Sequence, residues 1–174
     1  MNIGIKGMQD AGKTSLAVKA IVWHIEHNGF APQEVESTVE ILIPGVKFLY
    51  VDKALDALDR MVAPESYHKI LFLDEADSYL GHRDWEDKKQ YKRLKGLWQD
   101  QKRFNWCYWT SHVGNGVDKM LREMTEIILM PKYYKALDAS LTGFINKMDM
   151  EDGQIWFPNI SYIFDKYSRH APVW

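Results

Sequence analysis

The sequence predicts an α/β fold, in which helices flank a central and mainly parallel β-sheet. One observation is that short apolar runs typical of strands alternate with longer segments typical of helices. The other is a glycine-containing segment, GMQDAGKTS at Gly7–Ser15, that connects the first predicted strand to the first predicted helix. This alternation favours a parallel sheet that binds its ligand at the carboxyl ends of the strands.

The predicted strands are short runs rich in apolar and aromatic residues. They are Asn2–Lys6, Val35–Ile43, Lys47–Val51, Lys69–Leu73, Asn105–Thr110 and Glu126–Met130, followed by two β-like runs at Gln154–Phe157 and Ser161–Phe164. The run at Lys69–Leu73 (KILFL) is apolar almost throughout, which is typical of a strand buried on both faces. The Pro44-Gly45 pair predicts a turn between the second and third strands.

The predicted helices are longer, and the first begins directly after the glycine-containing segment. They are Thr14–His27, Asp52–Met61, Asp84–Arg103 and Val117–Met124. A chain of 174 residues with 46% hydrophobic residues is sufficient for one domain, and we expect a single domain over residues 1–174. The single cysteine, Cys107, excludes an internal disulfide and fits a reducing compartment.

The segment Gly7–Ser15 fits G-x-x-x-x-G-K-[ST], the phosphate-binding loop. The two glycines allow the backbone to approach a ligand closely, so that amides and the helix dipole face the phosphates. Lys13 is expected to reach the β- and γ-phosphates, and the Thr14 hydroxyl to bind Mg²⁺. The residues predicted to bind the nucleotide are Gly7, Asp10, Ala11, Gly12, Lys13, Thr14 and Ser15.

An acidic pair, Asp74-Glu75, follows the buried strand KILFL. After such a strand we expect Asp74 to hold Mg²⁺ through its water shell and Glu75 to polarise the attacking water. Carboxylates also favour the start of a helix, which is the simpler interpretation of the pair taken alone. The phosphate-binding loop upstream favours the catalytic interpretation and an ATP-hydrolysing enzyme that needs ATP and Mg²⁺.

Two alternatives compete with the ATPase. The segment Asn146–Asp149 (NKMD) matches the guanine-reading N-K-x-D pattern of small GTPases. However, those proteins carry D-x-x-G after the acidic strand, and here Asp74 is followed by Glu75-Ala76-Asp77. The tetrapeptide also lies between glycine-containing turns, so the tip of a β-hairpin explains it. A small-molecule kinase is the second alternative, because it shares the phosphate-binding loop.

Charge gives a local rather than a global indication of nucleic-acid binding. The formal net charge is −2, but Lys88–Arg103 contains seven basic residues against one acid, with Tyr91 and Trp98 among them. Such a segment either grips phosphates or forms a solvated helix face. No apolar run approaches the roughly 20 residues needed to span a bilayer.

From Asp74 onward, four segments resemble the FtsK/HerA superfamily. They are LDEADSYLGHR, DQKRFNWCYWTSH, VDKMLREMTEIIL and YIFDKYS. Within that superfamily the sequence is most similar to viral genome-packaging ATPases and to the zonula occludens toxin-like assembly proteins of filamentous phages. The resemblance implies a RecA/ASCE-like P-loop NTPase that moves DNA. This sequence departs from the family pattern after the fourth strand. A glutamine is usual there, whereas this chain has Thr110-Ser111-His112.

The resemblance also implies partners and further site residues. It implies a homo-oligomeric ring, expected to be a hexamer, acting on double- or single-stranded DNA together with capsid, portal or vertex proteins, in the host cytoplasm or the virion. In such a ring an arginine from the adjacent subunit completes each site, and Arg103 and Arg122 are the candidates, with Arg83 behind them. Ser111 or His112 would sense the γ-phosphate. A filamentous phage-like assembly or extrusion ATPase, or a nucleotide-dependent assembly switch, stays the alternative.

Overall fold

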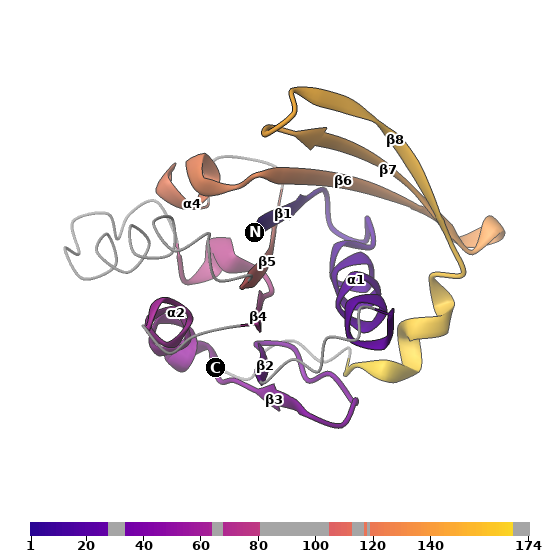
Figure 1. The fold of residues 1–174 in the computed structure, drawn as a ribbon. Coiled ribbons are helices and arrows are strands. Elements are labelled where there is room, and N and C mark those ends of the chain that lie inside the picture. The colour runs from indigo at the N-terminus through magenta and orange to yellow at the C-terminus, as the bar shows by residue number, and fades with distance from the viewer. Residues whose placement is uncertain (28–33, 64–67, 81–104, 113–116, 118, 169–174) are drawn as a thin grey trace.

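The computed structural model describes residues 1–27, 34–63, 68–80, 105–112, 117 and 119–168. Within them one eight-stranded sheet has the order β3-β2-β4-β5-β1-β6-β7-β8 (Figure 1). The strands are β1 (Asn2–Lys6), β2 (Glu34–Ser37), β3 (Val46–Phe48), β4 (Lys69–Leu73), β5 (Trp106–Ser111), β6 (Ile127–Tyr134), β7 (Ala139–Asn146) and β8 (Glu151–Pro158). The α-helices are α1 (Lys13–His27), α2 (Ala54–Val62) and α4 (Lys119–Met124), and the short 3₁₀ helices are η1 (Val51–Lys53), η2 (Ala76–Ser78), η5 (Lys135–Leu137) and η6 (Ser161–Lys166).

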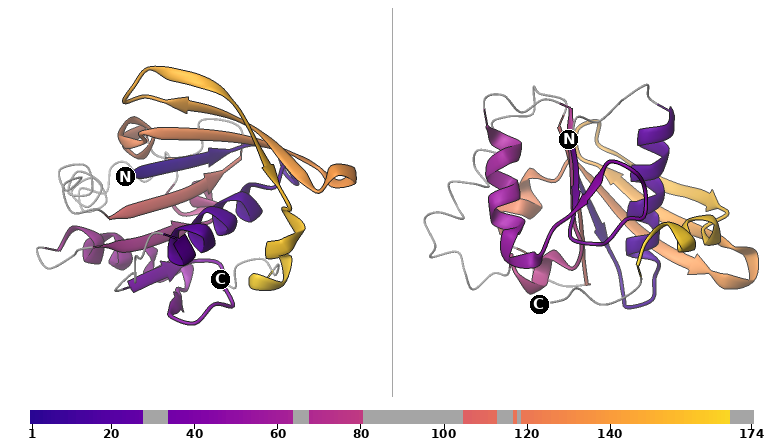
Figure 2. Two further views of the ribbon diagram at one scale, coloured as in Figure 1. Left: turned by 45° about the vertical axis from the view of Figure 1, so that its right-hand side comes forward. Right: turned by 90° about the horizontal axis from the view of Figure 1, so that it is seen from below.

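The sheet is parallel from β3 through β6 and continues into an antiparallel β6–β7–β8 meander. Helix α1 packs on one face, whereas α2 and α4 lie on the other, so that the sheet forms the middle of three layers (Figures 1 and 2). The segment η6 returns beside α1. The predicted α/β class, with a mainly parallel sheet flanked by helices, is therefore confirmed.

Alternating side chains give each face of the sheet its own core. On the α1 face, Ile3, Ile5 and Phe72 pack with the apolar side of α1. On the opposite face, Trp109 is fully buried among residues of β4, α2 and α4. Gly4 lies against the Trp109 indole so closely that a Cβ on Gly4 would stand 2.4 Å from a ring carbon. The central strand β1 therefore requires glycine where it passes this ring.

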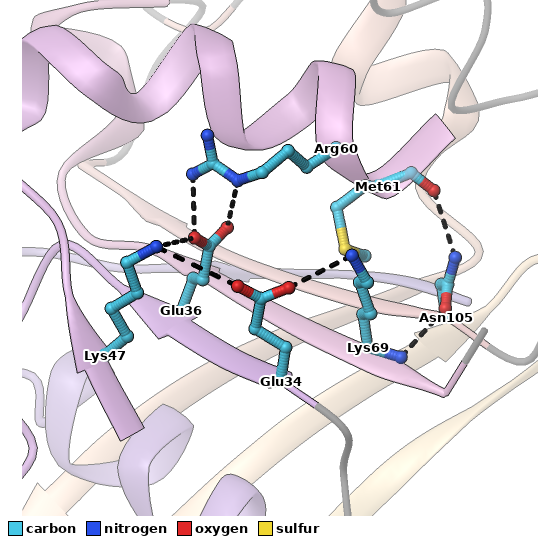
Figure 3. A network of polar contacts seen from close by, with 7 residues as sticks. All are labelled: Glu34, Glu36, Lys47, Arg60, Met61, Lys69 and Asn105. Atoms are coloured by element: carbon cyan, nitrogen blue, oxygen red, sulfur yellow. Dashed lines mark hydrogen bonds and ion pairs between the residues drawn. The ribbon is translucent and has the colours of Figure 1, made fainter. Parts of the chain in front are cut away.

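A network of charged residues ties the outer strands together (Figure 3). The Glu36 carboxylate on β2 is nearly buried, and it accepts hydrogen bonds from Arg60 on α2 at 2.7 and 3.2 Å. Lys47 on β3 lies 3.2 Å from the same carboxylate. Beside it, Glu34 pairs with Lys69 of β4 at 3.0 Å. Both oxygens of the buried Glu36 carboxylate thus face a cation, which offsets the cost of burying the charge.

Several predicted elements differ from the structure. Strand β2 ends at Ser37 instead of Ile43, because the Ser37 hydroxyl accepts the Val39 amide and turns the chain out of the sheet. Strands β2 and β3 run parallel, so that Pro44-Gly45 lies within a crossover and not in a hairpin. The predicted β-like run Ser161–Phe164 is wrong. It forms η6, whose first amide, that of Ser161, donates to the Asp138 carboxylate at 2.7 Å.

Strand β7 was not predicted from the sequence. It pairs along its whole length with both β6 and β8. The predicted helix Asp84–Arg103 and the basic segment Lys88–Arg103 lie outside the described residues. Among the residues that are described, no helix combines the length and the apolar character that crossing a bilayer requires.

Candidate functional site

The glycine-containing loop connects β1 to α1 at the carboxyl end of the sheet, as predicted. Gly12 has a φ of +82°, which glycine adopts without strain, and its carbonyl accepts the Leu16 amide that opens the helix. The Lys13 ammonium donates to the Met8 carbonyl at 2.8 Å and so folds back over the loop. Burial lowers the pKa of Lys13, while Asp74 and Glu75 oppose that shift. The loop thus presents a buried cation to the carboxylates that follow β4.

Asp74 is the centre of the polar contacts at the end of β4. Its carboxylate accepts the Thr14 hydroxyl at 3.0 Å and the Thr110 hydroxyl at 2.6 Å. Its own amide donates to the Thr38 hydroxyl at 2.8 Å. Burial raises the pKa of Asp74, and the hydroxyl donors counteract this only in part. Within the described part of the chain no ion pair includes Asp74.

These contacts fit a divalent cation of the magnesium type. A buried carboxylate and a threonine hydroxyl 3.0 Å apart are hard oxygen ligands, which Mg²⁺ prefers while it keeps part of its water shell. The structure thus brings together Thr14 and Asp74, the two residues that the sequence predicted for the metal.

Glu75 directly follows Asp74 in the sequence and has a strained backbone conformation. Its φ of 49° is left-handed, which is uncommon for a residue other than glycine and is often found at functional sites. The Glu75 amide donates to the Thr110 hydroxyl at 2.8 Å, which holds this turn against β5. The side chain of Glu75 lines the same cavity as Lys13 and Asp74.

The cavity at this end of the sheet has a volume of about 520 Å³. One end is polar and contains the phosphate-binding loop, the acidic pair and His112. The other end is formed by β6, η5 and the segment around η6. Its lining residues are Gln9, Asp10, Gly12, Lys13, Thr14, Ser15, Val39, Asp74, Glu75, His112, Tyr133, Lys135, Phe164, Tyr167 and Ser168. Of the predicted nucleotide-binding residues, Gly7 and Ala11 are not among them.

The residues after β5 occupy different positions. His112 lines the cavity, and the Asp77 carboxylate lies 3.3 Å from its amide nitrogen and 3.5 Å from its Nδ1. Ser111 is buried, its hydroxyl donates to the His112 carbonyl at 3.2 Å, and it is not among the lining residues. The residue that sequence reasoning missed is Thr110, which stands next to Asp74. The sequence did indicate that one residue of the Thr110-Ser111-His112 triplet would lie near the acidic pair. Which of the three it is depends on the register of the strand.

Of the predicted arginines, Arg122 is the one that the structure describes, and it is not among the residues that line this cavity. Arg122 lies on α4, and its carbonyl accepts the Lys147 ammonium at 2.8 Å. Arg103 and Arg83 lie outside the described residues.

The NKMD segment forms the tip of the β7–β8 hairpin, as the hairpin interpretation predicted. The Asn146 amide donates to the Asp149 carboxylate at 2.6 Å, and the Asn146 side-chain oxygen accepts the Met148 amide at 3.0 Å. Neither Asn146 nor Asp149 lines the cavity. The tetrapeptide is thus accounted for by the turn itself, which removes the main argument for a GTPase.

Comparison with solved structures shows the same fold in several P-loop proteins. The N-terminal domain of zonular occludens toxin from Neisseria meningitidis is 15% identical with a TM-score of 0.67, over 96% of this chain and 98% of that one. The genome-packaging NTPase of Sulfolobus turreted icosahedral virus 2, in complex with ATP-γS, is 8% identical with a TM-score of 0.65, over 90% and 96%. A KaiC-like protein from Pyrococcus horikoshii is 13% identical with a TM-score of 0.51, over 90% and 83%.

These likenesses confirm the predicted P-loop NTPase fold. They also confirm, at the level of the fold, the predicted resemblance to zonula occludens toxin-like and genome-packaging proteins. No protein-family model matches the chain, and no curated protein matches it in sequence.

Proposed function

We propose that this chain is the ATP-hydrolysing motor domain of a machine that moves DNA, with packaging of a viral genome as the task. The observation that supports it best is the convergence of Lys13, Thr14 and Asp74 on one cavity, with Glu75 directly beside them. The fold is shared with a packaging NTPase that was crystallised with an ATP analogue and with a viral DNA-packaging ATPase.

In this mechanism each side chain has one task. The loop amides and Lys13 bind the β- and γ-phosphates, and Thr14 and Asp74 hold Mg²⁺. The bound metal neutralises charge on the phosphate oxygens. Glu75 orients and polarises the attacking water, because it lines the same cavity and Thr110 holds its backbone turn. His112, at the polar end, is better placed than Ser111 to contact the γ-phosphate.

Two substitutions test the chemistry. Lys13→Ala should abolish ATP binding, because the phosphates lose the cation of the loop. Glu75→Gln should keep ATP binding and reduce kcat by at least about 100-fold, within the range for lost general-base catalysis. Calorimetry and a phosphate-release assay measure the two effects. Hydrolysis at the wild-type rate by Glu75→Gln would show that another group activates the water. Asp149→Ala is the matched carboxylate control and should leave both the activity and the ratio of ATP to GTP hydrolysis unchanged.

The motor function needs a separate test. The phosphate-release assay is run with and without double-stranded DNA, and translocation predicts stimulation by DNA. Slow turnover that is the same with and without DNA would favour the assembly or extrusion ATPase instead.

We further propose a homohexameric ring in which Arg122 or Arg103 acts on the neighbouring site. In mixed rings, an Arg122→Ala subunit should still bind ATP and should lower the turnover of its wild-type neighbour. If the protein is diluted to the monomer and keeps its full ATP turnover per subunit, the active site is not shared between subunits.

A further inference from the structure

The end of the cavity away from Asp74 is lined by aromatic side chains from two distant parts of the chain. Tyr133 lies on β6, and Phe164 and Tyr167 belong to η6 and the residue after it. The rings of Tyr133 and Phe164 are 6.1 Å apart between centroids and nearly perpendicular. We propose that Tyr133, Phe164 and Tyr167 form an aromatic clamp that binds the purine base of the nucleotide. This inference rests on the proposed function, because it places the base of the same nucleotide.

The aromatic clamp begins where a bound phosphate chain would leave the loop. Tyr133 packs on the loop itself, since a Cβ on Gly12 would lie 3.2 Å from the Cβ of Tyr133. Tyr167 reaches the first turn of α1, where its hydroxyl lies 2.8 Å from the Ser15 hydroxyl in a buried hydrogen bond. The three rings therefore line the cavity directly beside the loop whose amides would bind the phosphates, and the base of the same nucleotide would lie against them.

A single carboxylate holds the two walls of the aromatic clamp together. Asp138, just after η5, accepts the Tyr133 hydroxyl at 3.3 Å. The same carboxylate accepts the Ser161 amide at 2.7 Å and the Ser161 hydroxyl at 2.6 Å, at the start of η6. Hydrogen bonds from Ser161 lower the pKa of Asp138, so the carboxylate stays ionised and continues to accept these donors in mildly acidic solution. The walls are thereby fixed before any ligand arrives, which reduces the ordering cost of binding.

The lining chemistry favours stacking over reading of the base edge. Three aromatic residues line the cavity, and Val39 adds an apolar residue to the same lining. Stacking on aromatic rings depends on ring area and tolerates different edge groups. We therefore expect both purine nucleotides to bind better than pyrimidine nucleotides.

The test compares ATP with inorganic tripolyphosphate by isothermal titration calorimetry in the presence of Mg²⁺. Tripolyphosphate carries the phosphates without the base, so it reports on the loop alone. Phe164→Ala should weaken ATP binding at least tenfold and leave tripolyphosphate binding within twofold of the wild type. Tyr50→Ala is the matched control, because Tyr50 forms an edge-to-face pair with Phe48 outside the cavity and should change neither ligand.

Equal losses for both ligands, or no loss for ATP, would overturn the aromatic clamp. If Phe164→Ala loses all binding, Phe164→Leu decides, since it keeps apolar volume without a ring. A loss of at least threefold for ATP alone supports the aromatic clamp, and an equal loss for tripolyphosphate overturns it. The proposed function can fail independently of the aromatic clamp. If the wild-type protein binds ATP in this base-dependent way but does not hydrolyse it, the aromatic clamp stands and the proposed ATPase function is wrong.

Discussion

The Thr110 hydroxyl lies 2.6 Å from the Asp74 carboxylate, and the same oxygen accepts the Glu75 amide at 2.8 Å. One side chain of β5 therefore fixes both the residue proposed to hold the metal and the backbone of the residue proposed to activate water. The hydroxyl donates to one and accepts from the other, so its orientation is determined.

We predict that Thr110→Val reduces kcat for ATP hydrolysis at least tenfold with little change in KM. Valine keeps the shape but removes the hydroxyl, which leaves the Glu75 amide without its acceptor and Asp74 without a donor. Thr110→Ser restores the hydroxyl and should keep activity within a few-fold of the wild type. Steady-state kinetics measure both variants, and a Thr110→Val enzyme with unchanged kcat would refute the positioning role.

Asp74→Asn should stabilise the nucleotide-free protein while it removes the response to Mg²⁺ and ATP. Burial raises the pKa of Asp74 above its unfolded value, so ionisation of this carboxylate costs stability as the pH rises between the two values. A neutral amide avoids that cost, and we expect the melting temperature to rise by about 2–4 °C for each kcal/mol recovered. Thermal scans with and without Mg²⁺-ATP measure this. Asp52→Asn, at an exposed pair with Lys53, is the control and should shift neither scan.

The core around Trp109 should tolerate no side chain on β1. Gly4→Ala places a methyl group 2.4 Å from the buried indole, and we expect a loss of about 3 kcal/mol in the free energy of unfolding. Gly45→Ala provides the contrast, because Gly45 has a φ of +87° but no atom within 4 Å of the added Cβ. It should lose only about 1–2 kcal/mol from backbone strain. Urea titrations compare them, and an equal loss would show that the indole moves aside.

The charged network of the outer strands predicts a non-additive pair. Arg60→Met leaves the buried Glu36 carboxylate with Lys47 as its remaining cation, and we expect a loss of about 1–3 kcal/mol, reduced because Arg60 is partly exposed (Figure 3). Adding Glu36→Gln should recover part of this loss, because the buried charge is gone. A double-mutant cycle by chemical denaturation measures the coupling. If the two losses simply add, Arg60 and Glu36 are not energetically coupled.

Sequence patterns located the parts of the fold that local chemistry determines. β1 and β4 were predicted with their observed ends, because each is a short apolar run bounded by the loops that carry the chemistry. β7 was missed because ASLTGFIN combines small and polar residues, and only pairing with β6 and β8 makes it a strand. Ser161–Phe164 was predicted as a β-like run because it is rich in aromatic and β-branched residues, but the distant Asp138 carboxylate caps its first turn as a helix.

The same division applies to the candidate site. The loop and the acidic pair are contiguous motifs, so the sequence contains them whole. The position of Thr110 depends on how β5 is aligned with β4, where Leu73 lies level with Trp109. The aromatic clamp needs residues from β6 and η6 to meet, and no local pattern in the sequence indicates that meeting.

The place of β1 within the sheet has a consequence for how the chain folds during synthesis. Ile3 pairs with Tyr108 on one side and with Ile127 on the other, so β1 finds its neighbours only after β5 and β6 have been made. Contacts between residues so far apart in sequence form slowly. Until then, the phosphate-binding loop has no sheet beneath it, and its apolar strand stays exposed to chaperones and to other unfolded chains. Under the proposed function, nucleotide binding by a nascent chain therefore requires that β1 has already paired with β5 and β6.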